Sequence, residues 1–513
     1  KLHEAILMRK TLLQDNPCLS TSLINMYGKC GSLPKARKVM EELPVHDRDV
    51  YSWSSLISGY AQQGQPYEAL KCSDQMLSEG ISFNAFTLSC LLKACGSVRD
   101  VRKGMQIHYE IVNRGLLEEN SDVVLGNALV DMYAKCGELC DAEKVLQDIP
   151  IRNAVSWSAL IAGYAQKGKC DVALNCYAKM KGEGILPDSI AFICILKACG
   201  NTRALDKGKQ IHDEIVRRDL LEKDIMLGTT LVDMYAKCGV LTKAYEVLKG
   251  LPIRNVVSWN ALITGYAQQG QCTEALDCFT LMQNEGISPD AVTFINTLKS
   301  CASIGAIDEG KQIHEEIVGR GLLNKSNILL GNALVDMYVK CRLLVKARQV
   351  LEELLVRDVI SWNAMIATYA KHGYEAQCFK LFDEMHQNCL FADKFTFVSM
   401  LSACGNVDNL RHGQYMHVIL SHFCHEKEVI VGTALLDMYS KCCSIEDARK
   451  VFDLMHNRDI TSWNAMISGY SHFCHTQDAF YLFYEMMLKG IVPNKVTFVC
   501  LVDVCTISKS LLE

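Results

Sequence analysis

The stretch that decides the fold is VVSWNALITGYAQQGQCTEALDCFTLMQNEGISPD, which runs from Val256 to Asp290. It holds two groups of apolar residues at helical spacing, one around Leu262 and the other around Ala275. The Gln269-Gly270 step between them is typical of a helix C-terminus, where glycine takes the left-handed conformation without strain. The stretch therefore predicts two antiparallel helices joined by a tight turn.

Copies of this stretch recur along the whole chain. Each of the five tryptophans follows a serine in the same phrase, at positions 53, 157, 259, 362 and 463, so successive tryptophans are 104, 102, 103 and 101 residues apart. Self-similarity at a fixed period is typical of a solenoid, in which each copy buries its apolar face against its neighbours. We expect the tryptophans to be core anchors. The 513 residues should form one all-α, right-handed superhelix of helix pairs.

Three kinds of helix pair alternate within each hundred residues. Val256–Asp290 has 35 residues, Ala291–Asn327 has 37 and Ile328–Asp358 has 31, and we call these kinds standard, long and short repeats. Dividing the whole chain in this way gives repeats at 17–49, 50–84, 85–122, 123–153, 154–188, 189–224, 225–255, 256–290, 291–327, 328–358, 359–393, 394–428, 429–459 and 460–494, with partial repeats at 1–16 and 495–513. Because the chain starts and ends inside a repeat, we expect it to be a fragment of a longer protein.

Composition limits the classes of partner. The net charge of −5 argues against broad, charge-driven attraction to nucleic acid or membranes, so any polyanion must be bound through local contacts. No apolar run reaches the length of about 18 residues that a membrane span needs. We expect no membrane association, no cofactor and no small-molecule substrate.

Ten of the 25 cysteines stand at two repeated positions. One set is Cys30, Cys136, Cys238, Cys341 and Cys442, and the other is Cys95, Cys199, Cys301, Cys404 and Cys505. No C-x-x-C pair occurs, so disulfide and zinc frameworks are not indicated. We interpret these cysteines as small buried thiols in a reducing compartment.

The alternation of standard, long and short helix pairs resembles the pentatricopeptide repeat family, in its plant organellar subclass. The phrases SWNALITGY, LKACG, GKQIH and LVDMYAKCG are close to the consensus of that subclass, and the resemblance covers essentially all 513 residues. Tetratricopeptide repeats, the alternative, keep a constant repeat of about 34 residues and would make the chain a protein-interaction scaffold. The alternating repeat length argues against them.

The resemblance implies sequence-specific binding of single-stranded RNA, one base per repeat. It also implies site recognition in organellar C-to-U RNA editing, a form of RNA modification, in the mitochondrion or chloroplast, with editing-complex proteins as further partners. RNA splicing or stability remain alternative roles. Any deaminase domain would lie outside these residues, so we expect the chain itself not to be an enzyme.

The family reads each base with the fifth and the last residue of a repeat. On the standard and short repeats these pairs are Thr21/Asp49, Ser54/Asn84, Asn127/Asn153, Ser158/Asp188, Thr229/Asn255, Asn260/Asp290, Asn332/Asp358, Asn363/Asp393, Thr433/Asp459 and Asn464/Asn494. Every fifth residue is Asn, Ser or Thr, and every last residue is Asp or Asn. The alternative role for these residues is helix capping, which favours the same residue types. Capping alone does not explain why the fifth and the last residue each vary within a small set of residue types, independently of one another.

Hydrogen-bond chemistry supports the last position. A carboxylate accepts from the N–H of guanine or uracil, whereas an amide donates to the bare ring nitrogen of adenine or cytosine. The resemblance adds that Ser or Thr at the fifth position favours purines, that Asn favours pyrimidines, and that RNA runs parallel to the chain. The pairs then spell 5′-G-A-x-C-G-x-A-U-x-U-U-x-G-C-3′. The open letters belong to long repeats, whose fifth residues are Ser89, Ile193, Ile295 and Val398. The first repeat is two residues longer than the other short ones, so Asp47 is an alternative reader to Asp49.

Two further positions repeat. The second residue, which in the family packs against the base, is apolar in Val124, Val155, Met226, Val257, Leu329, Ile360 and Ile430, whereas Cys18, Tyr51 and Thr461 depart. These residues are alternatively ordinary core positions. The thirteenth residue of each short repeat is lysine: Lys29, Lys135, Lys237, Lys340 and Lys441. Such a row either neutralises phosphates or is simply solvated at helix C-termini.

Two signals of metal chemistry fail on inspection. His-x-Glu occurs at His108, His212 and His314, which echoes zinc deaminases, but no C-x-x-C completes the zinc site, so repeat packing is the better explanation. The duplicated SHFCH, at His422 to His425 and His472 to His475, lacks metal-ligand spacing. We expect no metal site and no catalytic residue.

Overall fold

The computed structural model describes residues 17–117, 123–222, 224–323, 327–354, 357–422, 428–473 and 475–510. Regular structure in these residues is entirely helical, comprising the α-helices α2 to α30 and one 3-10 turn, η1 (Val45–Asp47). Close packing divides the chain into two compact bodies, Lys1–Gly265 and Tyr266–Glu513. Helix α16 (Val256–Gln268) contains the boundary between them.

The helices alternate as the first and second members of successive pairs. In the first body they are α2 (Pro17–Lys29), α3 (Leu33–Glu42), α4 (Val50–Gln62), α5 (Pro66–Ser78), α6 (Ala85–Val98), α7 (Val101–Asn113), α8 (Val123–Cys136), α9 (Leu139–Asp148), α10 (Ala154–Gln166), α11 (Cys170–Gly182), α12 (Ser189–Thr202), α13 (Leu205–Arg217), α14 (Ile225–Lys237) and α15 (Leu241–Gly250). In the second body they are α17 (Cys272–Asn284), α18 (Ala291–Ile304), α19 (Ile307–Gly319), α20 (Ile328–Lys340), α21 (Leu344–Glu353), α22 (Val359–Lys371), α23 (Glu375–Gln387), α24 (Lys394–Asn406), α25 (Leu410–His422), α26 (Val429–Lys441), α27 (Ile445–Leu454), α28 (Ile460–His472), α29 (Thr476–Leu488) and α30 (Lys495–Ser510).

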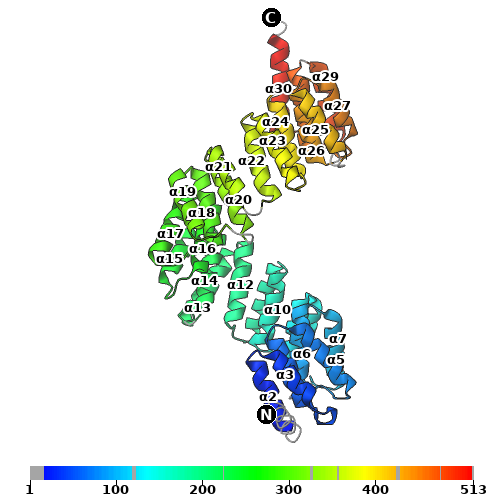
Figure 1. Ribbon diagram of the computed structural model, residues 1–513, viewed down its shortest axis with the longest axis vertical. Helices are drawn as coiled ribbons and strands as arrows, with labels where there is room; N and C mark the ends of the chain where they lie inside the picture. Colours follow the sequence, from blue (N-terminus) through cyan, green and yellow to red (C-terminus); the bar gives the residue numbers. More distant parts are fainter. Residues whose placement is uncertain are drawn as a thin grey trace, which may run out of the picture. The chain divides into compact units, whose positions relative to one another are not determined.

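The first helices of neighbouring pairs form one layer within each body (Figure 1). Helix α4, for example, packs against α2 before it and α6 after it, as well as against its own partner α5. The same pattern runs from α18 through α30 in the second body. An α-solenoid of helix repeats, as the sequence predicts, is therefore confirmed. Its even-numbered helices bring equivalent residues of successive repeats side by side.

Sequence periodicity correctly locates the core. All five tryptophans are buried, with at most 5% of each residue exposed, and Leu262 and Ile263 are fully buried. The tight turn also lies where the sequence places it, since Gly270 has φ of 75° in the left-handed region. The tryptophans are thus confirmed as core anchors.

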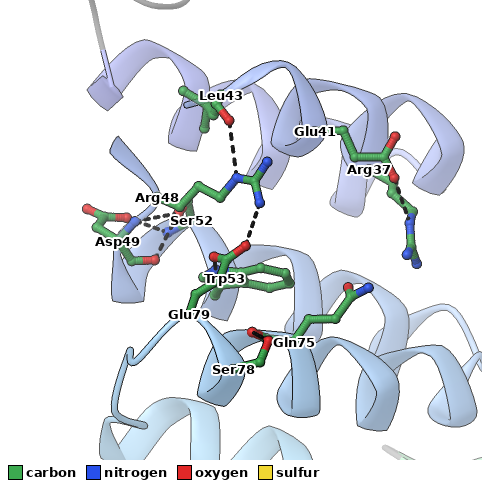
Figure 2. Close-up of polar contacts among 10 residues, drawn as sticks. All are labelled: Arg37, Glu41, Leu43, Arg48, Asp49, Ser52, Trp53, Gln75, Ser78 and Glu79. Carbon is green, nitrogen blue, oxygen red and sulfur yellow. Dashed lines mark hydrogen bonds and ion pairs between the residues drawn. The ribbon is translucent and has the colours of Figure 1, made fainter. Parts of the chain in front are cut away.

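A glutamate at the end of α5 links Trp53 of its own repeat to Arg48 of the preceding repeat (Figure 2). The indole Nε1 of Trp53 donates to Glu79 at 2.9 Å, and Arg48 donates to the other oxygen of Glu79 at 2.5 Å. In the next standard repeat, Trp157 donates to Glu183 at 3.1 Å. The glutamate thereby satisfies two donors that the packing removes from water.

The fourth standard repeat has lost this carboxylate. Asn388 stands where the earlier repeats have Glu79, Glu183 and Glu285. The Nε1 of Trp362 and the Nε of Arg357 are both buried without a hydrogen-bond partner among the described residues. An unsatisfied buried donor costs about 1–3 kcal/mol, so these two donors lower the stability of this repeat.

We expect Asn388→Glu to raise the free energy of unfolding by about 1–2 kcal/mol, because one carboxylate can accept from both orphaned donors. Urea denaturation of the variant and the wild type measures the change. Asn388→Gln is the matched control and should gain less, since hydrogen bonds to a charged acceptor are about twice as strong. An unchanged denaturation midpoint for Asn388→Glu would show that the two donors do not converge on this position.

Candidate functional site

The last residue of every standard and short repeat is the N-cap of the next first helix. Its Oδ1 accepts the backbone N–H three residues further on, at distances between 2.8 and 3.1 Å. These caps are Asp49, Asn84, Asn153, Asp188, Asn255, Asp290, Asp358, Asp393, Asp459 and Asn494. The capping role that the sequence leaves open is therefore real at all ten positions. Asp49, and not Asp47, is the residue that caps α4, since Asp47 lies in η1.

Capping uses only one of the two terminal atoms of the side chain. No described group bonds Nδ2 of Asn84, Asn153, Asn255 or Asn494, so these amides keep both N–H hydrogens. Among the described residues, Oδ2 of Asp49, Asp188 and Asp393 is likewise unbonded. Asp and Asn cap helices equally well, so capping does not explain which of them occurs. The free atom is a hydrogen-bond acceptor in Asp and a donor in Asn.

In four repeats, the fifth residue is hydrogen-bonded directly to the last residue of the same repeat. Direct hydrogen bonds join Ser158 to Asp188 at 2.8 Å and Asn363 to Asp393 at 2.9 Å. They also join Asn332 to both carboxylate oxygens of Asp358, at 3.1 and 3.0 Å. In the fourth pair, Asn464 donates to Asn494 at 3.2 Å. Residues about 30 apart in the sequence are thus assembled into polar pairs because neighbouring first helices pack side by side.

Other pairs are not joined directly. Ser54 shares a hydrogen bond with the Thr87 hydroxyl, which donates to Asn84 at 2.7 Å. The hydroxyls of Thr229 and Thr433 donate instead to carbonyls of their own helices.

Three pairs remain. No hydrogen bond between described groups joins Thr21 to Asp49 or Asn127 to Asn153, and Oδ1 of Asn127 is buried without a partner. Asn260 belongs to the first body and Asp290 to the second.

Asp393 is an acceptor at neutral pH. Burial would raise the pKa of Asp393, but the hydrogen bonds from the Thr396 backbone, Asn363 and the Thr396 hydroxyl outweigh it, and the pKa lies below its ordinary value. A carboxyl group with a lowered pKa stays ionised. It can therefore accept a hydrogen bond and cannot donate one.

The second residues form an exposed apolar row instead of a buried core. Tyr51, Val124, Val155, Met226, Val257, Leu329, Ile360 and Ile430 are each between 50% and 67% exposed. The core alternative for these positions is wrong, because on the first helix the second residue shares a face with the fifth and points away from the partner helix. The row also continues through the long repeats, whose second residues were not part of the prediction. These residues are 50–57% exposed: Phe86, Ile190, Val292, Phe395 and Val496.

A groove brings the second, fifth and last residues together. It has a volume of about 470 Å³ in the first body. Its lining includes Val124, Asn127, Val155, Ser158, Asp188 and Ile190. Exposed apolar side chains therefore flank the polar pairs, which suits a flat ring with a hydrogen-bonding edge.

Most of the repeated lysines are engaged in ion pairs. Four of them pair with the aspartate one turn earlier, with Nζ to Oδ2 distances of 2.7–2.8 Å: Lys135–Asp131, Lys237–Asp233, Lys340–Asp336 and Lys441–Asp437. Exposed pairs of this kind contribute about 0.3–0.5 kcal/mol. These four lysines are thus paired, but each pair is weak.

The His-x-Glu motifs serve packing. Nδ1 of His108, His212 and His314 lies 2.9 Å from the hydroxyl of a tyrosine on the following short repeat. Burial lowers the pKa of each of these histidines. Within the described ranges, no three His, Cys, Asp or Glu side chains cluster closely enough to hold a metal ion. The SHFCH copies include residues 423–425 and 474, which lie outside the described residues.

Burial follows the expectation at five of the nine repeated cysteines whose side chains the structure describes. Cys95, Cys199, Cys301 and Cys404 are fully buried, and burial raises the pKa of each to about 12. Cys442 is buried, whereas Cys136, Cys238 and Cys341 are half-buried. Cys30 is exposed, so it is not a packing thiol. None of the helices in the described part of the chain combines the length and the apolar character that crossing a bilayer requires.

Comparison with solved structures finds the same architecture. A pentatricopeptide repeat protein from maize superposes with a TM-score of 0.58 at 19% identity, over 96% of this chain and 82% of the maize chain. The same maize protein in complex with an 18-nucleotide RNA element gives a TM-score of 0.50 at 18% identity, over 94% of this chain and 81% of that one. At this identity the likeness concerns the fold.

Comparison of sequences identifies the family. A chloroplastic and a mitochondrial pentatricopeptide repeat-containing protein of Arabidopsis thaliana are each 34% identical to the chain, over 98% and 99% of it and 61% and 65% of their own lengths. A second chloroplastic relative is 32% identical over 94% of the chain and 77% of its own length. The chain thus spans less than two thirds of the first two relatives. The family model described as PPR repeat family matches residues 48–97, 152–201, 254–303, 357–406 and 458–506, and the PPR repeat model matches 19–47, 332–359 and 433–460. The chain belongs to the pentatricopeptide repeat family.

Proposed function

We propose that the chain binds single-stranded RNA and reads one base per repeat. The observation that carries the proposal is the capped reading pair, in which the last residue gives one atom to the helix N-terminus. In Asp188, Asp393 and Asn494, a direct hydrogen bond also joins that residue to its fifth residue, and the second terminal atom is not bonded by any described group. The exposed apolar row on the same face supplies surfaces for base stacking, which is a common mode of single-strand recognition. The maize relative of the same fold in complex with RNA supports this choice of ligand.

The pairs on this face are proposed as the base readers. Ser158/Asp188, Asn363/Asp393 and Asn464/Asn494 are the clearest cases, because a direct hydrogen bond fixes each pair. An amide has two N–H hydrogens, so Asn363 and Asn464 each keep one for a base. The fourteen repeats then select 5′-G-A-x-C-G-x-A-U-x-U-U-x-G-C-3′.

Binding to this RNA is tested by fluorescence anisotropy at physiological salt. We expect the fourteen-nucleotide RNA to bind at least about tenfold more tightly than an RNA with the same bases in reverse order, since several mismatches of about 1–3 kcal/mol each accumulate. The reversed RNA is a control for charge and composition, and the net charge of −5 keeps non-specific binding weak. Equal affinity for the two RNAs would contradict the proposal.

The more specific proposal is site recognition in organellar C-to-U editing by a member of the subclass with alternating repeat lengths. The regular rotation of 35-, 37- and 31-residue repeats supports the subclass, and the chloroplastic and mitochondrial names of the relatives support an organelle. We place catalysis outside these residues and expect editing-complex proteins as partners. Sequencing organellar transcripts from plants that lack the protein distinguishes loss of one C-to-U conversion from loss of a spliced or stable transcript.

A further inference from the structure

One reading pair differs from the others in what occupies its carboxylate. In the pair Thr433/Asp459, Oδ1 of Asp459 caps α28 by accepting the N–H of Ser462 at 2.9 Å, like every other cap. Its Oδ2, however, accepts the hydroxyl of Thr461 at 2.5 Å. Thr461 is the exposed second residue of the next repeat. Both oxygens of this carboxylate are therefore already bonded to the start of their own helix.

No other described cap is held in this way. Tyr51, Ile190 and Phe395 occupy the position of Thr461 after Asp49, Asp188 and Asp393, and none of them has a hydroxyl near the backbone. In Asp358 the second oxygen is bonded by Asn332, its own fifth residue, and not by the following repeat. The bond to Asp459 thus depends on the threonine at this position, where Asp188 and Asp393 are followed by the apolar Ile190 and Phe395.

The chain contains a matched comparison. Thr21/Asp49 has the same two reading residues as Thr433/Asp459, but it is followed by Tyr51. The hydroxyl of Thr433 donates to the Val429 carbonyl at 2.8 Å, so it does not reach Asp459. The two pairs share the same reading chemistry and differ in whether Oδ2 is free.

We propose that Thr461 is a specificity-determining residue, which masks the reading oxygen of Asp459 and makes this repeat tolerate adenine as well as guanine. The inference rests on the proposed function. The Thr461 hydroxyl competes with guanine N1–H for the lone pairs of Oδ2. With adenine, the same hydroxyl can rotate and donate to the bare N1, because a hydroxyl is both donor and acceptor. A carboxylate alone rejects adenine, and a carboxylate with this hydroxyl does not.

The test compares RNAs with G or A at the thirteenth nucleotide, bound to the wild type, Thr461→Val and Thr461→Ser. Valine matches threonine in shape and removes the hydroxyl, whereas serine keeps the hydroxyl. We expect the ratio of the two dissociation constants to be under about threefold for the wild type and Thr461→Ser. It should be about tenfold or more for Thr461→Val, the scale of a hydrogen bond to a charged group. Thr461 is exposed, so all three proteins should share one denaturation midpoint.

The fifth nucleotide, read by Ser158/Asp188, is the internal control. All three proteins should prefer G over A there by about tenfold, since Oδ2 of Asp188 is free of described groups. Normal discrimination at the fifth nucleotide with an unchanged ratio for Thr461→Val at the thirteenth overturns this inference alone. A wild type that already discriminates tenfold at the thirteenth nucleotide also overturns it. Absence of any preference at the fifth nucleotide overturns the proposed reading itself.

Discussion

Trp463→Ala is expected to lower the free energy of unfolding of its repeat by about 3–5 kcal/mol, because it removes the largest kind of buried side chain and leaves a cavity. Trp463 is fully buried, and its ring meets Phe452 edge to face with centroids 4.9 Å apart. Lys489 lies over the same ring, 5.4 Å from the centroid. In a solenoid each repeat contacts only its neighbours, so the loss should be local. Hydrogen exchange should speed up in α27 to α29 and stay unchanged in the first body.

A pair of conservative variants tests what the indole nitrogen contributes. Nε1 of Trp463 has no hydrogen-bond partner among the described residues, whereas Nε1 of Trp157 donates to Glu183. Trp157→Phe should therefore lower the free energy of unfolding by roughly 1 kcal/mol more than Trp463→Phe does, because it also removes a hydrogen bond to a charged group. Similar costs for the two variants would show that the Glu183 contact contributes little.

Asp393→Asn is expected to change the base preferred at the eleventh nucleotide from U to C. The substitution replaces an acceptor by a donor at the free atom of the cap, and each preference is on the order of 1 kcal/mol or more, so the ratio of affinities should shift by about 30-fold or more. Anisotropy with RNAs carrying U or C at that nucleotide measures the shift. The stability should not change, because Asn494 caps α30 with the same geometry.

The reciprocal variant is the control for this exchange. Asn494→Asp should move the fourteenth nucleotide from C towards U and leave the eleventh unchanged. If Asp393→Asn still prefers U, the last residue does not read the base in this chain, even though it caps the helix.

Periodicity was sufficient to predict the helix pairs and the core. The phrase around Trp259 recurs with its apolar spacing intact, and apolar spacing is what decides which face is buried. It was not sufficient at the second residues. Val155 and Ile360 have the same character as core residues, and only the packing direction of the first helix shows that they are exposed.

Contacts between repeats could not be predicted from the sequence, for a different reason. The bond from Thr461 to Asp459 depends on a side-chain rotamer in the first turn of α28, which no spacing rule fixes. The ion pair of Lys135 with Asp131 lies within one helix, and its i,i+4 spacing recurs with the aspartate at three other short repeats, so the sequence alone is sufficient to predict it.

Helix capping sets a limit on how such a chain can be retargeted. On the proposed reading, exchange of Asp for Asn changes the recognised base and conserves the cap, so it is close to neutral for folding. Exchange for alanine or leucine at the same position would cost about 1 kcal/mol per helix. Ten such losses together approach the whole net stability of a typical domain, about 5–15 kcal/mol. If the last residue reads the base, the requirement for a helix cap limits that position to a few residue types before any RNA is bound. A designer who seeks a new target should therefore vary the fifth residue more freely than the last.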